Sequence, residues 1–478
     1  MKRTRQILGL VLALAGSLLM ASEGEKPLPK DLPPYGADRP IPPLNVAQHT
    51  LSNGLTVWLV KRPGFPKVTS YLVVRGGNAS DPAGKQGLTG MMAQLLNEGT
   101  TSRTSRQIAE ELQSVGGDLG SWAALDAVYL YGSSLSTGLP TLLDVLADVA
   151  QHPTFPAAEV ALAKTNTLQG LQAQESMPNF QVNRAFNAAI FRGHPYRFAA
   201  IKPEVVQAAT REAFIALHAQ RFHPEQALLV LSGDFDEPRA LEWVKADFGA
   251  WKRGAVELKP TPEAPKASVH AFLLLPRPGS VQSTLRVGRP TVPATHPDYI
   301  PLRLANVILG GSFDSRIVKN IREDKGYTYS PGGAAFAYQH GGVFYISAAV
   351  RTEVTAASLM EIFYEMDRMG TTTVGAPELQ RAKRYMGGSY LFQNQMLQAL
   401  TGTLATYWVN GQKPEALAEF VSNVNAVTAA DIRRIGQTYF PSKDQTVVVV
   451  GDEAKAKAEM EQFGPVTLLK PEGPSSKP

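Results

Sequence analysis

The chain repeats one pattern of residues at a separation of 218 positions. The pattern is an aromatic residue, a proline, a short apolar strand and a closing Gly-Asp pair, found in RFHPEQALLVLSGD (221–234) and in YFPSKDQTVVVVGD (439–452). Upstream, TREAFIALHAQRF corresponds to TAADIRRIGQTYF, and FPAAEVALAKTNTL corresponds more loosely to VGAPELQRAKRYM. Three matches in the same order predict a duplicated domain of about 200 residues.

The length and composition agree with a globular protein of several domains. The chain has 478 residues, of which 44% are hydrophobic and 19% charged, so we expect more than one core. Its charge of +5 is a small difference between 47 basic and 42 acidic residues. No basic block is interleaved with aromatic residues, so we expect no nucleic-acid partner. There is no cysteine, which excludes disulfides and a thiolate nucleophile.

The first 45 residues are predicted to lie outside the globular domains. Three basic residues precede the apolar run 7–20, and Ala21 and Ser22 follow it, which indicates a secretory signal peptide cleaved near residue 22. An uncleaved anchor is the alternative. Residues 23–45 hold seven prolines and are predicted to form an extended arm. We therefore expect a periplasmic protein with no membrane span after signal removal.

The periodicity of the remainder predicts an α+β fold of two homologous domains. Each domain is expected to be an antiparallel-rich sheet with helices packed on one face. Strands are predicted at 55–60, 68–74 and 128–135, and helices at 105–117, 139–151 and 156–176. The proline-containing stretch 252–267 is the predicted linker between domains 46–251 and 268–460, and 461–478 is the predicted flexible tail.

The stretch GLTGMMAQLLNEGT (87–100) predicts a further helix. Its apolar residues Leu88, Met91, Met92, Leu95 and Leu96 are spaced to form one stripe on a helix, and Gly99 follows where a helix would stop. By itself this pattern indicates only a core helix.

Together with its surroundings, this stretch resembles the pitrilysin and mitochondrial processing peptidase family of zinc peptidases. The resemblance spans about residues 45–460 and includes NGLTVWLV, RGGNASDPAGKQGL, QSVGG, RGHPYRFAA and LGGSFDSRIVKNIREDKGYTYS. Members carry the zinc motif H-x-x-E-H within G-L-A-H-F-L-E-H-M-L-F-K-G-T. The resemblance implies paired α+β domains and hydrolysis of peptides.

This chain departs from the family at every position that holds or serves the zinc. Aligned without gaps, the two zinc histidines fall at Gly90 and Gln94, the catalytic glutamate at Ala93, and the distal glutamate ligand near Gly170. A catalytic zinc needs about three protein ligands and a base for its water. The eight histidines are otherwise scattered, apart from His218 and His223. We therefore expect no metal in this chain.

The second half retains a different part of the family's site. Members use an arginine and a tyrosine seven residues apart, which here correspond to Arg322 and Tyr329 in IREDKGYTY. The resemblance implies that they donate hydrogen bonds to the substrate backbone and to the oxyanion. Two alternatives stay open: Arg322 as a solvated helix residue paired with Glu323 or Asp324, and Tyr329 as an aromatic residue packed on a sheet.

The combination resembles the zinc-free subunit of heterodimeric family members. We expect zinc and the general base in a homologous H-x-x-E-H partner, and a peptide or unfolded protein as substrate. Family substrates add as a strand to a sheet edge, which here would be near Leu119, Gly120, Ser121 and Trp122, although the productive edge belongs to the zinc-bearing subunit. The alternative is a catalytically inactive peptide-binding or scaffold protein. An independent hydrolase lacks support, because no GxSxG elbow is present.

Overall fold

The computed structural model describes residues 44–254, 261–267 and 269–470. The predicted signal peptide, nearly all of the proline-rich arm, part of the linker and the last eight residues lie outside the described residues. The described residues belong to one compact unit that begins at Leu44.

The first half of this unit, residues 46–251, contains one sheet and eight α-helices among its described residues. The strands are β1 (Ala47–Thr50), β2 (Thr56–Lys61), β3 (Lys67–Arg75), β4 (Asp118–Ala123), β5 (Ala127–Leu135) and β6 (Ala227–Gly233). The helices are α2 (Leu88–Gln94), α3 (Ser105–Ser114), α4 (Leu139–Gln151), α5 (Ala157–Glu175), α6 (Pro178–Phe191), α7 (Pro203–Ala208), α8 (Arg211–Arg221) and α9 (Glu237–Phe248).

The second half, described from residue 269 to residue 470, repeats this order of elements except that its outermost strand, β12, comes last in the sequence rather than first. Its strands are β7 (Ala271–Pro276), β8 (Gln282–Thr291), β9 (Gly332–Tyr338), β10 (Gly341–Arg351), β11 (Thr446–Gly451) and β12 (Val466–Leu468). Its α-helices are α10 (Tyr299–Asn306), α11 (Thr355–Thr371), α12 (Ala376–Gln393), α13 (Leu397–Val409), α14 (Ala416–Ala426), α15 (Ala429–Tyr439) and α16 (Glu453–Met460). Two π-helical segments, η5 (Val307–Gly311) and η6 (Val318–Asp324), follow α10.

The two sheets have corresponding strand orders. The first is β1-β2-β6-β3-β5-β4 and the second is β12-β7-β11-β8-β10-β9. In both, the repeated Gly-Asp stretch forms an inner strand, β6 or β11, whose residues are all buried. Most neighbouring strands are antiparallel; the parallel pairs are β2 with β6, β7 with β11 and β7 with β12. The predicted fold class is confirmed.

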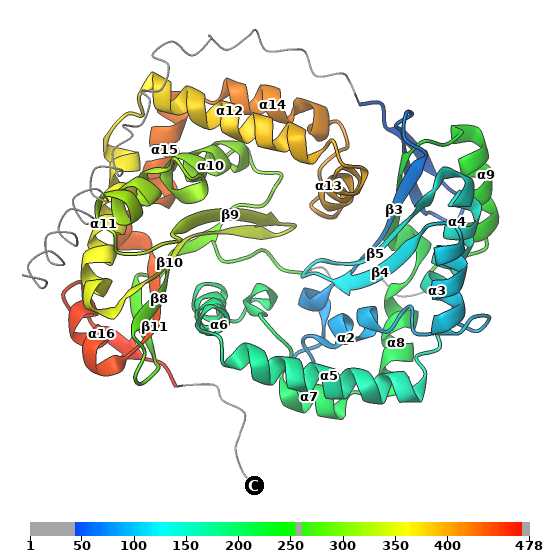
Figure 1. Cartoon of the computed structure of the whole chain (residues 1–478), viewed down its shortest axis with the longest axis horizontal. Coiled ribbons are helices and arrows are strands. Elements are labelled where there is room, and N and C mark those ends of the chain that lie inside the picture. The colour runs from blue at the N-terminus through cyan, green and yellow to red at the C-terminus, as the bar shows by residue number, and fades with distance from the viewer. Residues whose placement is uncertain (1–43, 255–260, 268, 471–478) are drawn as a thin grey trace, which may run out of the picture. The chain divides into compact units, whose positions relative to one another are not determined.

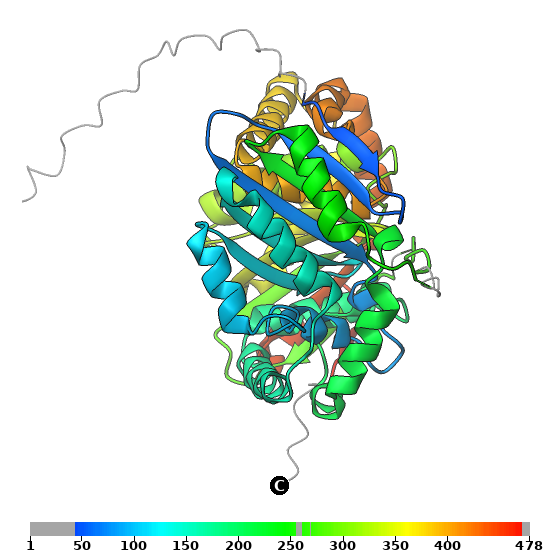
Figure 2. The same cartoon turned by 90° about the vertical axis from the view of Figure 1, so that its right-hand side faces the viewer.

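Helices cover the outer face of each sheet. In the first half, α4 packs on β5 and α9, and their apolar residues join the core beneath β2, β3 and β6. Figure 2 views the first half from this helical side. In the second half, α11, α15 and α16 form the corresponding layer.

Each half also places one helix on the inner face of the other half's sheet. Helix α6 packs on β8 and β11, whereas α13 packs on β3 and β6 (Figure 1). An arginine joins each pair: Arg75 on β3 stacks on Trp408 of α13 with its Cζ atom 4.1 Å from the ring centroid, and Arg286 on β8 contacts Asn183 of α6. The two halves are therefore held together by exchanged helices, which the sequence did not predict.

Several local boundaries differ from the prediction, among them the end of α3 at Ser114 rather than at residue 117. Helix α2 ends at Gln94, so Leu95 and Leu96 are buried beyond its last turn. Residues 466–468, which we expected in the flexible tail, form β12 and pair with β7. Val466 packs against the hydrophobic core that is formed mainly by the second half, which explains why this segment joins the sheet.

Candidate functional site

Helix α2, which carries three of the four lost zinc-site positions, begins at a constrained glycine. Gly87 has φ +96°, and a Cβ atom there would lie 2.6 Å from Ile201. The Asp81 carboxylate accepts hydrogen bonds from the Gly87 and Thr89 amides at 2.8 and 3.2 Å. Asp81 also accepts a hydrogen bond from Nη2 of the buried Arg221 at 2.9 Å. This network fixes the start of α2 against α8.

The structure brings two of the lost ligand positions to one cavity. Gln94 on α2 and Gly170 on α5 both line a cavity of about 500 Å³. Glu98 and Glu159 also line it. Burial, with a smaller contribution from the nearby Glu159, raises the pKa of Glu98.

At the other two positions, Gly90 and Ala93, backbone atoms form hydrogen bonds that hold α2 in place. The Gly90 amide donates to Asn78 Oδ1 at 2.9 Å, and a Cβ atom at Gly90 would lie only 3.2 Å from that oxygen. The Ala93 carbonyl accepts a hydrogen bond from Ser121 Oγ of β4 at 2.6 Å. Helix α2 therefore serves as a packed structural element.

The residues at this location do not fit a zinc ion. Glycine and alanine offer no side-chain ligand, and glutamine is a neutral amide rather than a preferred zinc ligand. Across residues 44–254, 261–267 and 269–470, no three histidine, cysteine, aspartate or glutamate residues are grouped so that they could hold a metal. His218 lies five positions before His223 in the sequence. Its Nε2 atom forms a hydrogen bond with the Ala150 carbonyl at 2.9 Å.

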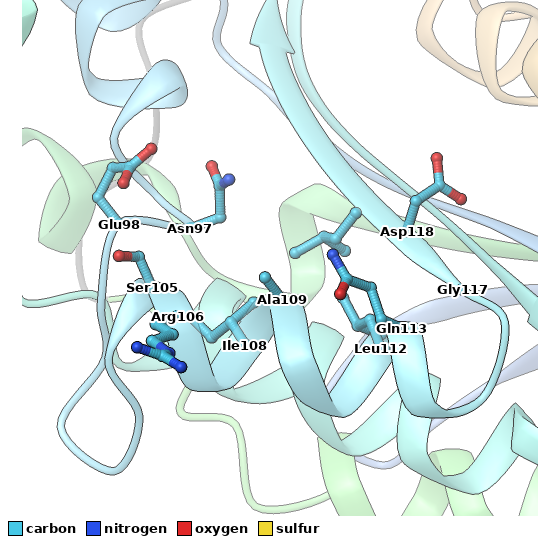
Figure 3. A pocket seen from close by; sticks show the side chains of 11 residues that line it. Asn97, Glu98, Ser105, Arg106, Ile108, Ala109, Leu112, Gln113, Gly117 and Asp118 are labelled. Carbon is cyan, nitrogen blue, oxygen red and sulfur yellow. The ribbon is translucent and has the colours of Figure 1, made fainter.

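The four residues predicted to bind substrate lie together on β4, an edge strand. Strand β4 pairs with β5 through Asp118 to Ala123 and ends the sheet on that side. Beside its start, a cavity of about 430 Å³ lies between Leu119, the segment around Asn97 and helix α3. Figure 3 shows Ile108, Leu112 and Gln113 of α3 along one side of this cavity and Asn97 with Glu98 on another.

The inner face of the β4 edge is aromatic. Trp122 stacks on Tyr129 of β5 with ring centroids 5.4 Å apart and an interplanar angle of 5°. It also meets the Tyr71 ring edge-on at 5.9 Å. Trp122 nevertheless keeps 41% of its surface exposed. A Cβ atom at Gly120 would meet no atom within 4 Å, so the edge beside Trp122 is open among the described residues.

Arg322 and Tyr329 lie side by side in the second half. Arg322 is on η6, a π-helical segment, a rare form that is often found at functional sites. The chain then turns at Gly326, whose φ is +63°, and Thr328 Oγ1 donates to the Ala349 carbonyl of β10 at 2.6 Å. This turn brings Tyr329 back, and the Arg322 Cζ atom lies 4.8 Å from the centroid of its ring.

The surroundings of Arg322 and Tyr329 can be compared with the two alternatives given above, a local ion pair for Arg322 and packing on a sheet for Tyr329. Arg322 Nε lies 3.2 Å from a Glu323 carboxylate oxygen, so the expected local ion pair is present. Tyr329 precedes β9 and has 80% of its surface exposed, so it does not pack on a sheet. No hydrogen bond to another described residue engages the terminal nitrogens of Arg322, which leaves them available to an external acceptor.

A third residue beside this pair was missed by the sequence analysis. Phe313, in the turn between η5 and η6, has its ring centroid 4.7 Å from the Arg322 Cζ atom. It belongs to LGGSFDSR, but nothing in that stretch predicted contact with an arginine nine positions later. The feature of the sequence that could have identified Phe313 is an apolar ring in an otherwise polar turn.

Family models match most of the chain. The model of the insulinase (peptidase M16) family matches residues 56–204, and the model described as the peptidase M16 inactive domain matches residues 208–386. The curated relatives include an uncharacterized zinc protease of Rickettsia felis, 24% identical over 79% of this chain and 91% of its own. Another, from Bacillus subtilis, is 22% identical over 83% of this chain and 96% of its own.

Solved structures share the fold. A crystal structure described as the peptidase M16 inactive domain from Pseudomonas fluorescens has a TM-score of 0.80 and 23% identity, covering 86% of this chain and 98% of its own. A protease from Helicobacter pylori has a TM-score of 0.79 and 18% identity, covering 85% of this chain and 99% of its own.

Proposed function

Since the chain belongs to the peptidase M16 family, we propose that it is the zinc-free subunit of a heterodimeric zinc metallopeptidase. In this proposal a homologous H-x-x-E-H subunit holds the zinc and the general base, and this chain supplies Arg322 and Tyr329 to the partner's active site. No step of the reaction is assigned to α2 of this chain, because its residues do not fit a metal.

One observation carries the proposal: the chain combines unusable zinc positions with a contacting pair of a partly exposed Arg322 and an exposed Tyr329. Gly90, Ala93, Gln94 and Gly170 provide neither a set of ligands nor a base. The guanidinium of Arg322, by contrast, contacts the ring of Tyr329, with 26% of the Arg322 side chain and 80% of Tyr329 exposed. A scaffold protein has no chemical requirement for this second feature, whereas a subunit that completes another subunit's site does.

The proposed role of the pair is electrostatic stabilisation of the scissile carbonyl. Arginine stays charged and presents a planar fork of donors, and the ion pair with Glu323 engages Nε. The terminal nitrogens can then donate to the substrate, while the Tyr329 hydroxyl adds a neutral donor. Removal of one such donor from an oxyanion site typically costs about 3 kcal/mol of transition-state stabilisation.

The proposed substrate is an extended peptide in the periplasm. The basic and apolar leader at residues 1–22 supports export, and a strand that pairs with a sheet edge through its backbone tolerates many sequences. In this subunit β4 is one edge of the first sheet, and it carries the exposed Trp122. No helix among the described residues is long and apolar enough to cross a membrane.

The test is to measure peptidase activity for the chain alone and for its mixture with a zinc-motif family member from the same organism. The proposal predicts activity of the mixture that neither chain reaches alone. A stable complex without enhanced activity would instead support the scaffold alternative.

A further inference from the structure

Phe313 and Tyr329 are two large exposed rings that contact the same guanidinium. Phe313 has 70% of its surface exposed and Tyr329 has 80%, yet their ring centroids lie 4.7 and 4.8 Å from the Arg322 Cζ atom. An arginine over an aromatic ring is attracted by the ring's electrons, even at an exposed site. Arg322 is thus restrained by contacts on its planar group as well as by Glu323.

The turn that carries Phe313 is fixed independently of its ring. The neighbouring Arg316 forms two 2.8 Å hydrogen bonds with the carboxylate of Glu378 on α12. Asp314 pairs with Lys319 at 2.5 Å and with Arg381 of α12 at 3.2 Å. Lys319 is also the main reason why the pKa of Asp314 is lowered. The backbone at Phe313 is therefore held by ion pairs to α12, and its exposed ring fills no core.

The segment that carries Tyr329 is also anchored to the fold. The Tyr327 amide donates to the Ile321 carbonyl at 2.9 Å, which closes the turn after η6. Thr328 joins the same turn to β10. Because both ring-bearing segments are fixed to the fold, the two rings provide a preformed place for the Arg322 side chain.

From these contacts we propose that Phe313 is a positioning residue, which holds the Arg322 guanidinium beside Tyr329 so that its terminal nitrogens face the scissile carbonyl. This inference rests on the proposed function of the Arg322–Tyr329 pair. A long arginine side chain otherwise samples many rotamers, and each donor contributes most when it is already in place before the transition state forms. The Phe313 ring restricts this motion without touching the substrate.

The experiment compares Phe313→Ala, Phe313→Tyr and wild type in the reconstituted two-subunit enzyme. We expect Phe313→Ala to lower kcat about 2- to 5-fold, the factor that corresponds to one exposed cation–π contact, with KM and complex formation unchanged. Phe313→Tyr keeps a ring in place and is expected to restore kcat. The matched control is Phe65→Ala, because Phe65 is 66% exposed and lies in the first half, in the turn between β2 and β3.

A second readout uses the isolated subunit and needs no activity. The Arg322 Nε–H resonance is expected to be shifted by the ring currents of its neighbours, and Phe313→Ala should move it toward the position typical of a solvated arginine. An unchanged resonance would overturn the inference.

The variants separate this inference from the function on which it rests. Wild-type kcat in Phe313→Ala, together with impaired Arg322→Ala and Tyr329→Phe, would overturn only the positioning role. Wild-type rates in Arg322→Ala and Tyr329→Phe would remove the proposed function itself. Loss of complex formation in Phe313→Ala would also overturn the inference, because Phe313 would then be an interface residue.

Discussion

Restoring the family's residues at three positions of α2 should not create a zinc site. The variant is Gly90→His, Ala93→Glu and Gln94→His. It supplies two imidazoles and a carboxylate in the place of the base, but the third ligand from α5 is still missing. A catalytic zinc site needs about three protein ligands. We therefore expect well under one zinc per chain after dialysis.

The structure also predicts the cost of this variant to folding. The imidazole introduced by Gly90→His must displace Asn78, whose hydrogen bond to the backbone amide of Gly90 is worth about 1 kcal/mol. Ala93 is fully buried, and inserting a larger side chain into a packed core costs about 1–3 kcal/mol. The Glu carboxylate adds the cost of burying a polar group without a partner. The free energy of unfolding should therefore fall by at least about 3 kcal/mol, measured by urea denaturation.

A fourth substitution tests the cavity geometry directly. Gly170→Glu adds the distal ligand, and a Cβ atom at Gly170 meets nothing within 4 Å, so we expect the quadruple variant to bind one zinc per chain. The matched control replaces Gly388, which lies at a similar place along α12 and is equally open. Gly388→Glu in the triple background should bind none. Stoichiometric zinc in the triple variant, or none in the quadruple variant, would refute the alignment of α2 and α5 with the family's ligand positions.

Two further predictions concern the reconstituted enzyme. Arg322→Ala or Tyr329→Phe should each lower kcat about 100-fold, the typical effect of losing one oxyanion donor, while gel filtration shows unchanged assembly; wild-type rates would remove their role. Trp122→Ala tests whether the β4 edge of this subunit binds peptide in addition to the productive edge of the zinc-bearing subunit. We expect it to raise KM for an unfolded peptide about 3- to 10-fold, as when an aromatic contact is lost, whereas Leu135→Ala, a substitution at a 47% exposed residue of β5, should leave KM unchanged. An unchanged KM in Trp122→Ala would exclude Trp122 from the substrate contacts.

The parts of the fold with a strong local pattern could be predicted from the sequence. The apolar residues predicted to form the stripe in 87–100 are all buried, although Leu95 and Leu96 lie beyond the end of α2. A helix with one apolar face is stable only when that face is covered. The repeated stretches became α8 with β6 and α15 with β11. Here local periodicity and tertiary burial agree, so the sequence alone was sufficient to predict these helices and strands.

The exchanged helices could not be predicted in this way. Apolar residues on α6 and α13 show that each helix is buried, but they do not identify the sheet that buries it. The contact of Arg75 with the Trp408 carbonyl joins residues 333 positions apart. Such a pairing depends on how the two halves meet, which local patterns do not contain.

The positions of the candidate site come from the family motif rather than from a local pattern. Gln94 and Gly170 were identified by alignment, and the structure places them at one cavity. Phe313 was not identified because its ring is exposed and lacks the burial pattern that periodicity detects. Its contact with Arg322 depends on two turns and a π-helical segment, whose geometry the sequence does not reveal.

The most direct test of the proposed half-site is zinc content and peptidase activity of the chain from residue 23, measured alone and mixed with a zinc-motif family member from the same organism. We expect no zinc and no activity for this chain alone, and one zinc per heterodimer with strong activity in the mixture. Stoichiometric zinc or peptide hydrolysis by this chain alone would contradict the central claim that it carries only the arginine and tyrosine part of the active site.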